Sequence, residues 1–306
     1  MSRSVVRRPV TRLRAGRPPV TRPDSLAAEE PLEIRVAGRP LAVTMRTPGT
    51  AETDWDLASG FLLTEGVVTA ADQIAGIRYC AGSVATLVPG VDEPVPQNTY
   101  NVLDIGLAPG VPAPDPSLER AFFTTSSCGV CGKASIDAVR TTSVFDVAAD
   151  PVRLPAELVL GLPDRLRAAQ RVFDSTGGLH GAALVDPTGR RPDLVREDVG
   201  RHNAVDKVLG AAFRTGEVPA RGRVLVVSGR ASFELTQKAL MAGVPALVAV
   251  SAPSSLAVEL AEAVGMTLVG FVRGDSMVVY AGGHRVTDAG AEAVVPTGPA
   301  AAALRR

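Results

Sequence analysis

The chain has 306 residues, of which 46% are hydrophobic and 21% charged, a composition typical of a globular protein. Lys and Arg together number 32, as do Asp and Glu, so no excess charge directs the whole chain to nucleic acid or another polyanion. No apolar run approaches the roughly 18 residues of a membrane span, and no apolar segment of a secretory signal follows the first arginines. Three cysteines are too few for a disulfide scaffold. We therefore expect a cytoplasmic protein with reduced thiols that binds neither membrane nor nucleic acid.

Both ends of the chain have biased compositions. The segment before the first acid, Asp24, is basic through Arg3, Arg7, Arg8, Arg12, Arg14, Arg17 and Arg22. Such a block could contact nucleic acid or anionic lipid, but a disordered, solvated tail is the favoured interpretation. Residues 291–306 consist largely of Ala, Gly and Pro. The sequence therefore predicts a disordered Arg-rich tail over residues 1–25 and a second disordered tail over residues 291–306.

Residues 26–150 form a predicted N-terminal region that contains β-structure. In chain order we expect a hairpin over residues 32–44, a helix over 53–65 with Thr53 as its cap, and strands over 74–79 and 100–105. Four prolines within residues 109–116 then indicate an extended surface segment. This segment leads into the most cysteine-dense part of the chain.

Residues 151–290 form a predicted second domain. A helix over 155–173, kinked at Pro163, precedes a strand over 180–185 and a helix over 203–213 with Asn203 as its cap. Strands over 223–227, 245–251 and 267–272 then alternate with helices over 232–241 and 254–264. Apolar strands joined by crossover helices indicate an α/β fold, in which a parallel sheet is covered on both faces.

The ends of these strands are the first candidate site. Ligands of open α/β sheets bind beyond the carboxyl ends of the strands, where helix N-termini favour anions. Residues 251–253 follow one strand, and the other two strands are followed by Ser228, Gly229 and Arg230, and by Phe271, Val272, Arg273, Gly274, Asp275 and Ser276. These turns predict a phosphate or nucleotide site without the glycine patterns of Rossmann or P-loop proteins. The alternative is that Ser232 and Ser254 merely cap helices.

Two histidines supply further candidates. His202 lies in a charged cluster over residues 196–203, beside the predicted helix cap. The alternative is a solvated helix start. His180 begins a predicted strand, where hydrogen bonds to the backbone alone could satisfy its imidazole nitrogens. We place His202 among the ligand-binding candidates.

The CxxC pair formed by Cys128 and Cys131 is the sharpest chemical feature, and it has three possible uses. A zinc site would require two more ligands, and the sequence has no second CxxC. Dithiol exchange usually places the first cysteine at the start of a helix, whereas this motif ends a proline-rich segment. Sulfur carriage needs an accessible thiolate that accepts a persulfide, and a neighbouring thiol can then release the sulfur. Spacing alone leaves all three open.

The order of motifs argues against a zinc deaminase. Those enzymes carry HxE first and PCxxC after it, whereas here CxxC precedes every histidine.

Taken together, several segments resemble the FdhD family, the accessory sulfurtransferases of formate dehydrogenase. The matching motifs, in one order, are EEPLEI at 29–34, GFLLTEG at 60–66, SSCGVCG at 126–132, TGGLH at 176–180, REDVGRHNAVDK at 196–207 and SGR at 228–230. The resemblance runs from about Glu29 to Gly282, most of the chain apart from its two tails.

The resemblance implies a sulfur carrier. Such a protein takes sulfur from a cysteine desulfurase as a persulfide and passes it to the bis(pterin guanine dinucleotide) cofactor of molybdenum or tungsten, before that cofactor enters formate dehydrogenase. In family terms Cys128 corresponds to the persulfide-bearing position and Cys131 to its partner, and Phe271 to Ser276 correspond to the cofactor-contacting segment. The family further implies a three-layer domain similar to cytidine deaminase without its zinc. An α/β domain of this kind is compatible with a homodimer.

Two other functions remain open from the residues. One is a non-catalytic chaperone that binds the cofactor and uses CxxC as a structural clip. The other is a structural zinc protein.

Overall fold

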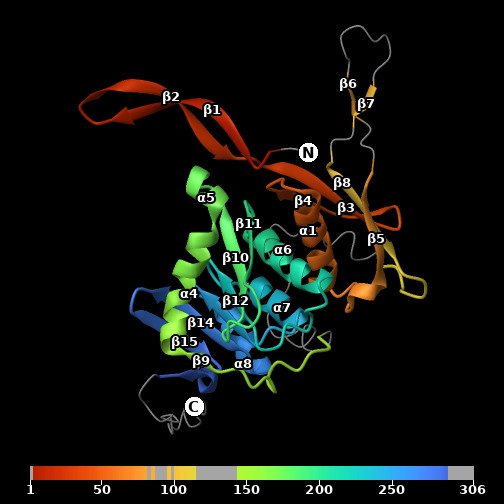
Figure 1. The fold of residues 1–306 in the computed structure, drawn as a ribbon, viewed down its shortest axis with the longest axis vertical. Helices are drawn as coiled ribbons and strands as arrows, with labels where there is room; N and C mark the ends of the chain where they lie inside the picture. Colours follow the sequence, from red (N-terminus) through yellow and green to blue (C-terminus); the bar gives the residue numbers. More distant parts are fainter. Residues whose placement is uncertain (1–2, 81–83, 87–94, 98–99, 115–142, 289–306) are drawn as a thin grey trace, which may run out of the picture.

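The structure, a computed structural model, describes residues 3–80, 84–86, 95–97, 100–114 and 143–288. It is a mixed α/β protein built around a six-stranded sheet and a four-stranded sheet, with helices between and around them (Figure 1). Within the described residues, none of the helices is long and apolar enough to cross a membrane.

The six-stranded sheet has the order β11-β10-β12-β13-β14-β15. Its strands are β10 (His180–Val185), β11 (Leu194–Asp198), β12 (Val224–Val227), β13 (Ala246–Ala249), β14 (Thr267–Arg273) and β15 (Ser276–Ala281). Only β12, β13 and β14 are parallel neighbours, and the three other pairings are antiparallel. The predicted parallel sheet is therefore correct for its centre alone. The prediction missed β11 and β15, which pair with a preceding strand as antiparallel hairpins that need no crossover helix.

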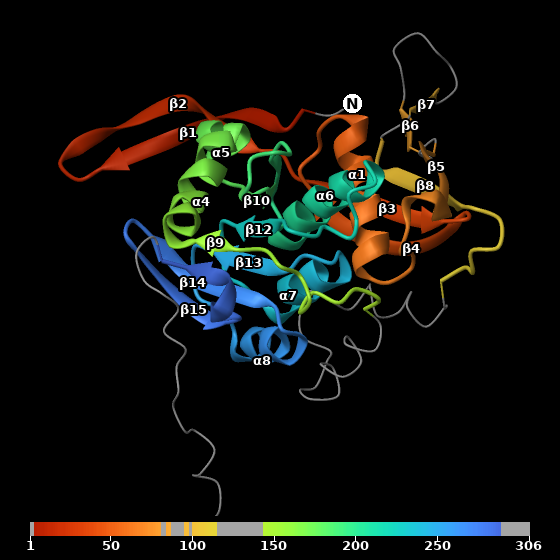
Figure 2. The same ribbon diagram turned by 60° about the horizontal axis from the view of Figure 1, so that its bottom comes forward.

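Helices cover both faces of this sheet. Helix α4 (Ala156–Ala169) packs on one face, while α6 (Arg201–Arg214), α7 (Phe233–Met241) and α8 (Ser255–Val264) pack on the other (Figure 2). Alternation along β12 explains this, because Val224 and Val226 face α4 whereas Leu225 faces the three helices. The specific likeness to cytidine deaminase stays a prediction.

The four-stranded sheet has the order β4-β3-β8-β5 and joins the same core. Its strands are β3 (Glu30–Val36), β4 (Arg39–Arg46), β5 (Ile74–Tyr79) and β8 (Val102–Leu107). They confirm the predicted hairpin and both predicted strands. Helix α1 (Ala51–Thr64) packs between this sheet and α6, so one hydrophobic core continues across residue 150.

Helices α1 and α6 cross at two glycines. A Cβ atom on Gly60 would overlap the carbonyl oxygen of Asp206, and one on Gly210 would overlap that of Asp56. Only residues without a side chain allow the two backbones to approach this closely. This crossing fastens the smaller sheet to the larger one.

The remaining elements are short. They are η1 (Ala71–Gln73), β6 (Val84–Thr86), β7 (Val95–Gln97), β9 (Leu154–Pro155), α5 (Arg171–Thr176), η2 (Gly283–Arg285) and β16 (Val286–Thr287). The pairs β6–β7 and β9–β16 each form a two-stranded sheet.

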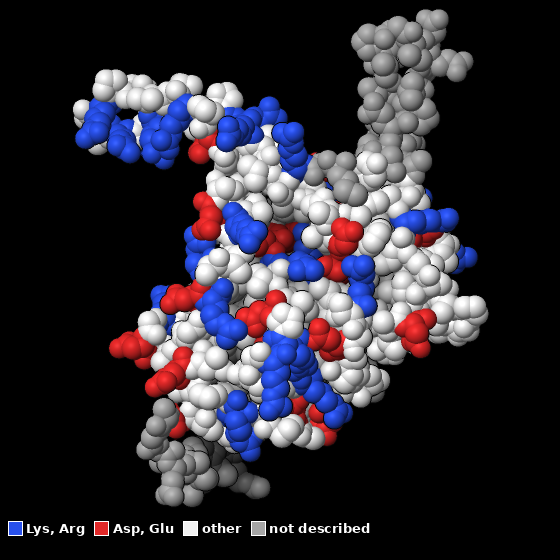
Figure 3. Space-filling view, in the orientation of Figure 1, with Lys and Arg blue, Asp and Glu red and all other residues white. Residues whose placement is uncertain are grey.

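The predicted disordered tail over residues 1–25 is wrong for residues 5–25. The segment forms an antiparallel hairpin of β1 (Val5–Arg14) and β2 (Arg17–Ala27) that projects from the body, with basic side chains along it (Figures 1 and 3). Gly16, with φ of 70°, makes the tight turn between the paired Arg14 and Arg17. The valines and threonines that alternate with the arginines favour strands. The prediction gave more weight to the many arginines than to this alternation.

Opposed prolines protect the edges of this hairpin. Pro9 pairs with Pro23, and since neither can donate to the other, this pair must occupy a non-hydrogen-bonded position of the ladder. At such a position the missing N–H would have pointed outward. The hairpin therefore resists pairing with a further strand.

Three predicted helix details also need correction. Thr50, not Thr53, precedes the first residue of α1, and the hydroxyl of Thr53 donates to the carbonyl of Thr50. Helix α6 begins after Gly200, so Asn203 lies inside its first turn and bonds Met45 and Thr44 instead. The helix predicted to kink at Pro163 runs through it and breaks at Gln170, where α5 begins.

Candidate functional site

Backbone hydrogen bonds place the ends of β12, β13 and β14 in one row. The amide of Ser251 donates to the carbonyl of Gly229 at 3.2 Å, and the amide of Phe271 donates to the carbonyl of Ser251 at 3.2 Å. The predicted turns after β12 and β13 therefore meet at one edge of the sheet. Ser232 and Ser254 cap α7 and α8 there, because each hydroxyl accepts an amide of its own helix. We name this row of residues 228–231, 250–254 and 271 the strand-end crevice.

The segment Phe271–Ser276 has an unusual backbone. Phe271 adopts a φ of 51°, which costs free energy for a residue with a side chain, and its ring is 39% exposed. A break in the β14–β15 register accompanies this strain. Val272, predicted to contact the ligand, has its side chain fully buried in the core, so only its backbone is available. The other four predicted residues are exposed around the β14–β15 turn, namely Arg273, Gly274, Asp275 and Ser276.

His202 links two helix starts beside the crevice. Its Nε2 lies 2.5 Å from the Glu234 carboxylate in the first turn of α7, and this bond lowers the pKa of Glu234. On the same helix, the buried Lys207 ammonium bonds Asp198 at 2.6 Å and the carbonyl of Thr47. His202 therefore connects α6 to α7. The predicted Arg230 is exposed on the turn after β12.

His180 faces the crevice from the start of β10. A Cβ atom on Gly229 would lie 3.7 Å from its Nδ1, which shows how closely the ring approaches that turn. Burial lowers the pKa of His180, and the charges of Arg201 and His202 lower it further, while Asp198 opposes them. The imidazole is therefore neutral at pH 7.

We expect His180 to titrate below the ordinary histidine pKa of about 6.5, and Arg201→Gln to bring its pKa closer to that value. The unfolded chain binds this proton more readily than the folded chain, so the His180 contribution to stability is present above pH 6.5 and is lost as the pH falls. Histidine NMR titration of both proteins measures the shift. A pKa of His180 above 6.5 in the parent protein contradicts the assignment.

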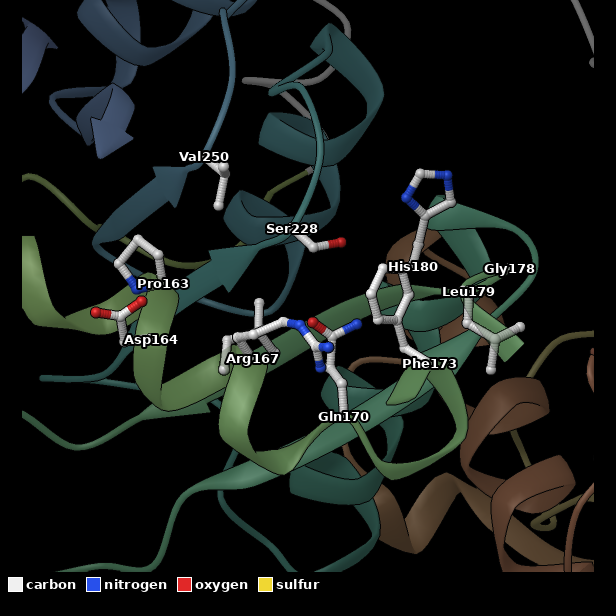
Figure 4. Close-up of a pocket in the computed structure, with 12 residues that line it drawn as sticks. Pro163, Asp164, Arg167, Gln170, Phe173, Gly178, Leu179, His180, Ser228 and Val250 are labelled. Atoms are coloured by element: carbon white, nitrogen blue, oxygen red, sulfur yellow. The ribbon is translucent and has the colours of Figure 1, made fainter. Parts of the chain in front are cut away.

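A cavity of about 580 Å³ opens beside the crevice. Arg167, Gln170 and Phe173 border it from α4 and α5, and Ser228 and Val250 border it from the ends of β12 and β13 (Figure 4). Its size lies within the range of small-molecule sites in proteins, about 300–1,000 Å³. Ser228 and Val250 belong both to the wall of the cavity and to the strand-end crevice, so the two are adjacent.

The predicted thiols Cys128 and Cys131 lie outside the described residues. Of the described cysteines there is only Cys80, whose thiol is free and partly exposed. The described part of the chain holds no group of three or more His, Cys, Asp or Glu side chains arranged to bind a metal.

Fold and site together define an α/β protein with an anion-compatible crevice at the carboxyl ends of its parallel strands. The chain belongs to the FdhD/NarQ family, whose model matches residues 27–287. It is 60% identical over 287 residues to the "Sulfur carrier protein FdhD" of Streptomyces avermitilis, covering 94% of this chain and 97% of that protein. It is 57% identical over 268 residues to the protein of the same name from Mycobacterium tuberculosis, covering 88% and 94%.

A crystal structure assigned to a formate dehydrogenase accessory protein of Desulfotalea psychrophila has the same fold. The TM-score is 0.68, at 21% identity, and the match covers 92% of this chain and 99% of that one. The resemblance inferred from the motifs is therefore confirmed at the level of the family.

The sequence did not reveal the wall that α4 and α5 contribute. Arg167 lies in the last turn of α4 and Gln170 at the break that follows it, but the apolar spacing of this segment predicted only core packing. The cation–π contact of Arg167 with Phe173, at 4.6 Å from the ring centre, joins residues on either side of the helix break.

Proposed function

We propose that this protein carries sulfur as a persulfide on Cys128 and delivers it to the bis(pterin guanine dinucleotide) cofactor of molybdenum or tungsten, which is then inserted into formate dehydrogenase. The cofactor is the cargo of the reaction. The observation that carries this proposal is the 60% identity to a sulfur carrier protein, in a chain whose own sequence contains the Cys128–Cys131 pair.

The strand-end crevice supports the cofactor part of the proposal. A dinucleotide cofactor carries phosphates, which suit the exposed guanidinium groups of Arg230 and Arg273 and the hydroxyl groups near them. The strained Phe271 lies in the segment that corresponds to the family's cofactor contact, and such strain is typical of functional positions.

The chemistry balances with the two cysteines alone. A cysteine desulfurase transfers a sulfane sulfur to the Cys128 thiolate, which forms Cys128–S–SH. The Cys131 thiolate then attacks the inner sulfur, so that a Cys128–Cys131 disulfide forms and HS⁻ leaves. The dithiol supplies the two electrons that reduce the sulfur, and the sulfide becomes a ligand of the metal. Restoring the carrier needs two more electrons, which an external dithiol reductant supplies by thiol–disulfide exchange with the Cys128–Cys131 disulfide.

We expect incubation with a cysteine desulfurase and cysteine to add the mass of one sulfur atom to the protein, and Cys128→Ala to abolish this gain. Cys131→Ala should still gain the sulfur but fail to release it. Intact-protein mass spectrometry, with and without a reductant, measures both. Absence of any gain in the parent protein with an active desulfurase would overturn the carrier function.

The competing function is a chaperone that binds and hands over the cofactor without carrying sulfur. It is favoured by the same crevice. The two functions differ in cells, because a chaperone predicts that Cys128→Ala still activates formate dehydrogenase while Arg273→Ala does not. A sulfur carrier requires Cys128 for activation.

A further inference from the structure

The hairpin of β1 and β2, which we call the arm, has two different faces. Residues directly opposite each other in an antiparallel pair share a face, as do alternate residues along one strand. One face, which we call the arginine face, consists of Arg8, Arg12, Arg22, Val6, Val10, Val20, Leu26 and Asp24. The other face is mostly uncharged and consists of Val5, Arg7, Pro9, Thr11, Thr21, Pro23, Ser25 and Ala27. Figure 3 shows basic side chains gathered along one border of the arm.

The contacts at the base of the arm leave the arginine face free. Ser25 and Ala27, on the uncharged face, are half-buried, whereas Val6 and Leu26 on the arginine face are 38% and 43% exposed. The Cβ atom of Ala27 would lie 3.4 Å from a Cβ atom on Gly178, and β2 lies against α5 (Figures 1 and 2). The body therefore covers the uncharged face at its base and leaves the arginine face to solvent.

The arginine face exposes aliphatic side chains that a partner could cover. Val20 is 58% exposed, and Val6 and Leu26 are exposed on the same face. An isolated two-stranded hairpin is marginally stable in water at best, so a partner on this face would stabilise the arm as well. Because the paired prolines block both edges, the partner lies on the face of the hairpin instead of adding a strand to it.

The arm also differs in charge from the rest of the chain. Residues 1–27 hold seven of the 32 basic residues and one of the 32 acidic residues, so their formal charge is +6 and that of the remaining chain is −6. Interfaces between proteins match a positive surface with a negative one. The arginine face therefore fits a partner that presents acidic side chains.

The mixture of side chains on the arginine face favours a protein over a polyanion or a membrane. The backbone of a nucleic acid would pair with the guanidinium groups but offers little to the aliphatic groups, and the arm has no aromatic residue to stack on bases. Insertion into a membrane needs an apolar face separate from the charged one, whereas here both kinds of side chain share one face. Arginine among apolar groups is typical of the centre of a protein–protein interface.

We propose that the arginine face docks an acidic surface of the protein that receives the cargo, an inference that rests on the proposed function. Gly178, which lies beside Ala27 at the base of the arm, also lines the cavity next to the strand-end crevice. A protein that collects the cargo from this region approaches the same rim, from which the arm projects (Figure 1). The arm therefore positions the recipient, formate dehydrogenase, before the transfer.

Cofactor-free formate dehydrogenase is the probe for this interaction. We expect Arg8→Thr, Arg12→Thr and Arg22→Thr together to weaken its binding at least tenfold and to reduce the dependence of binding on salt, because three guanidinium groups leave the interface. Threonine favours strands, so the hairpin is kept. Val20→Thr should weaken binding by about threefold with unchanged salt dependence, because it removes apolar contact and no charge. Biolayer interferometry over a range of salt concentrations measures each affinity.

Two controls separate the arginine face from net charge. Arg39→Thr, Arg190→Thr and Arg221→Thr together remove the same charge from exposed positions of the body. Arg7→Thr removes one charge from the uncharged face of the arm, next to Arg8 in the sequence. We expect both proteins to bind formate dehydrogenase within about twofold of the parent, because isolated exposed charges contribute little.

Several outcomes would overturn the inference. One is an unchanged affinity for formate dehydrogenase in the arm variant, and another is an equal loss in the body variant. A parent dimer that the arm variant dissociates would assign the arm to a second copy, and binding to duplex DNA or anionic vesicles that only the arm variant loses, while formate dehydrogenase binding persists, would assign it to a polyanion.

The proposed function is tested separately in the same proteins. Circular dichroism and the unfolding midpoint show whether each variant is folded, and Val20→Thr serves if the arm variant has lost its hairpin. Sulfur loading of Cys128 by a cysteine desulfurase should be equal in all of them. Absence of loading in the parent would count against the proposed function, whereas normal loading with an unchanged affinity for formate dehydrogenase in the arm variant would count against the arm alone.

Discussion

Gly210→Ala is expected to lower the free energy of unfolding by about 3 kcal/mol or more. The new methyl group would overlap the carbonyl oxygen of Asp56, so α1 and α6 must move apart along their whole contact. Two packed helix backbones cannot relax locally as a flexible side chain can. Because a domain has only about 5–15 kcal/mol of stability, the loss is a large share of the total. Urea unfolding followed by circular dichroism measures it.

Gly161→Ala is the matched control. Gly161 also lies inside a helix, α4, but a Cβ atom there would meet nothing within 4 Å. The same substitution should therefore raise the free energy of unfolding by up to about 1 kcal/mol, through helix propensity alone. Similar effects at both glycines would show that the close approach of α1 and α6 is not what Gly210 provides.

Lys238→Met is expected to lower the free energy of unfolding by about 3–5 kcal/mol, because it leaves the buried Asp206 carboxylate without its counter-charge. The Lys238 ammonium lies 3.0 Å from Asp206, whose side chain is 3% exposed, and also bonds Thr64. Burial alone would lower the pKa of Lys238, but Asp206 and Glu65 raise it, so the ammonium stays charged. Denaturant unfolding at neutral pH measures the loss.

A double variant and a surface ion pair test whether an uncompensated buried charge causes this loss of stability. Lys238→Met combined with Asp206→Leu should recover much of the loss, because the uncompensated charge is gone. Arg165→Ala breaks the Arg165–Asp193 pair, whose side chains are 43% and 26% exposed, and should cost at most about 1 kcal/mol. A double variant less stable than Lys238→Met would contradict the explanation.

Periodicity and turn residues predicted most of the central elements. The ranges of β5 and β10 were predicted correctly, because apolar runs are local signals. The alternative interpretation of Ser232 and Ser254 as helix caps is also confirmed, since a serine at a helix start is such a signal too. Interactions between distant segments decided the remaining elements. Helix α6 starts earlier than its sequence suggests because Asn203 bonds Met45 and Thr44 on β4 instead of capping the helix.

Part of the candidate site could also be predicted from the sequence, and part of it could not. The turns after β12 and β13 and the segment at Phe271 were predictable, since the carboxyl ends of parallel strands meet at one edge. The burial of Val272 was not, because the register break that turns Phe271 outward depends on pairing with β15. Nor was the burial of Gln170, which packs against Gly181 on β10.

The glycine crossing of α1 with α6 also sets an order of events during synthesis. The ribosome makes α1 and the four-stranded sheet first, but the surface that covers α1 is not made until α6 emerges, after Gly210. Until then the face of α1 around Gly60, which the finished protein packs against α6, has no cover. Since incompletely folded chains with exposed apolar surface aggregate, the first half of this protein is most prone to aggregation before residue 210 has been made.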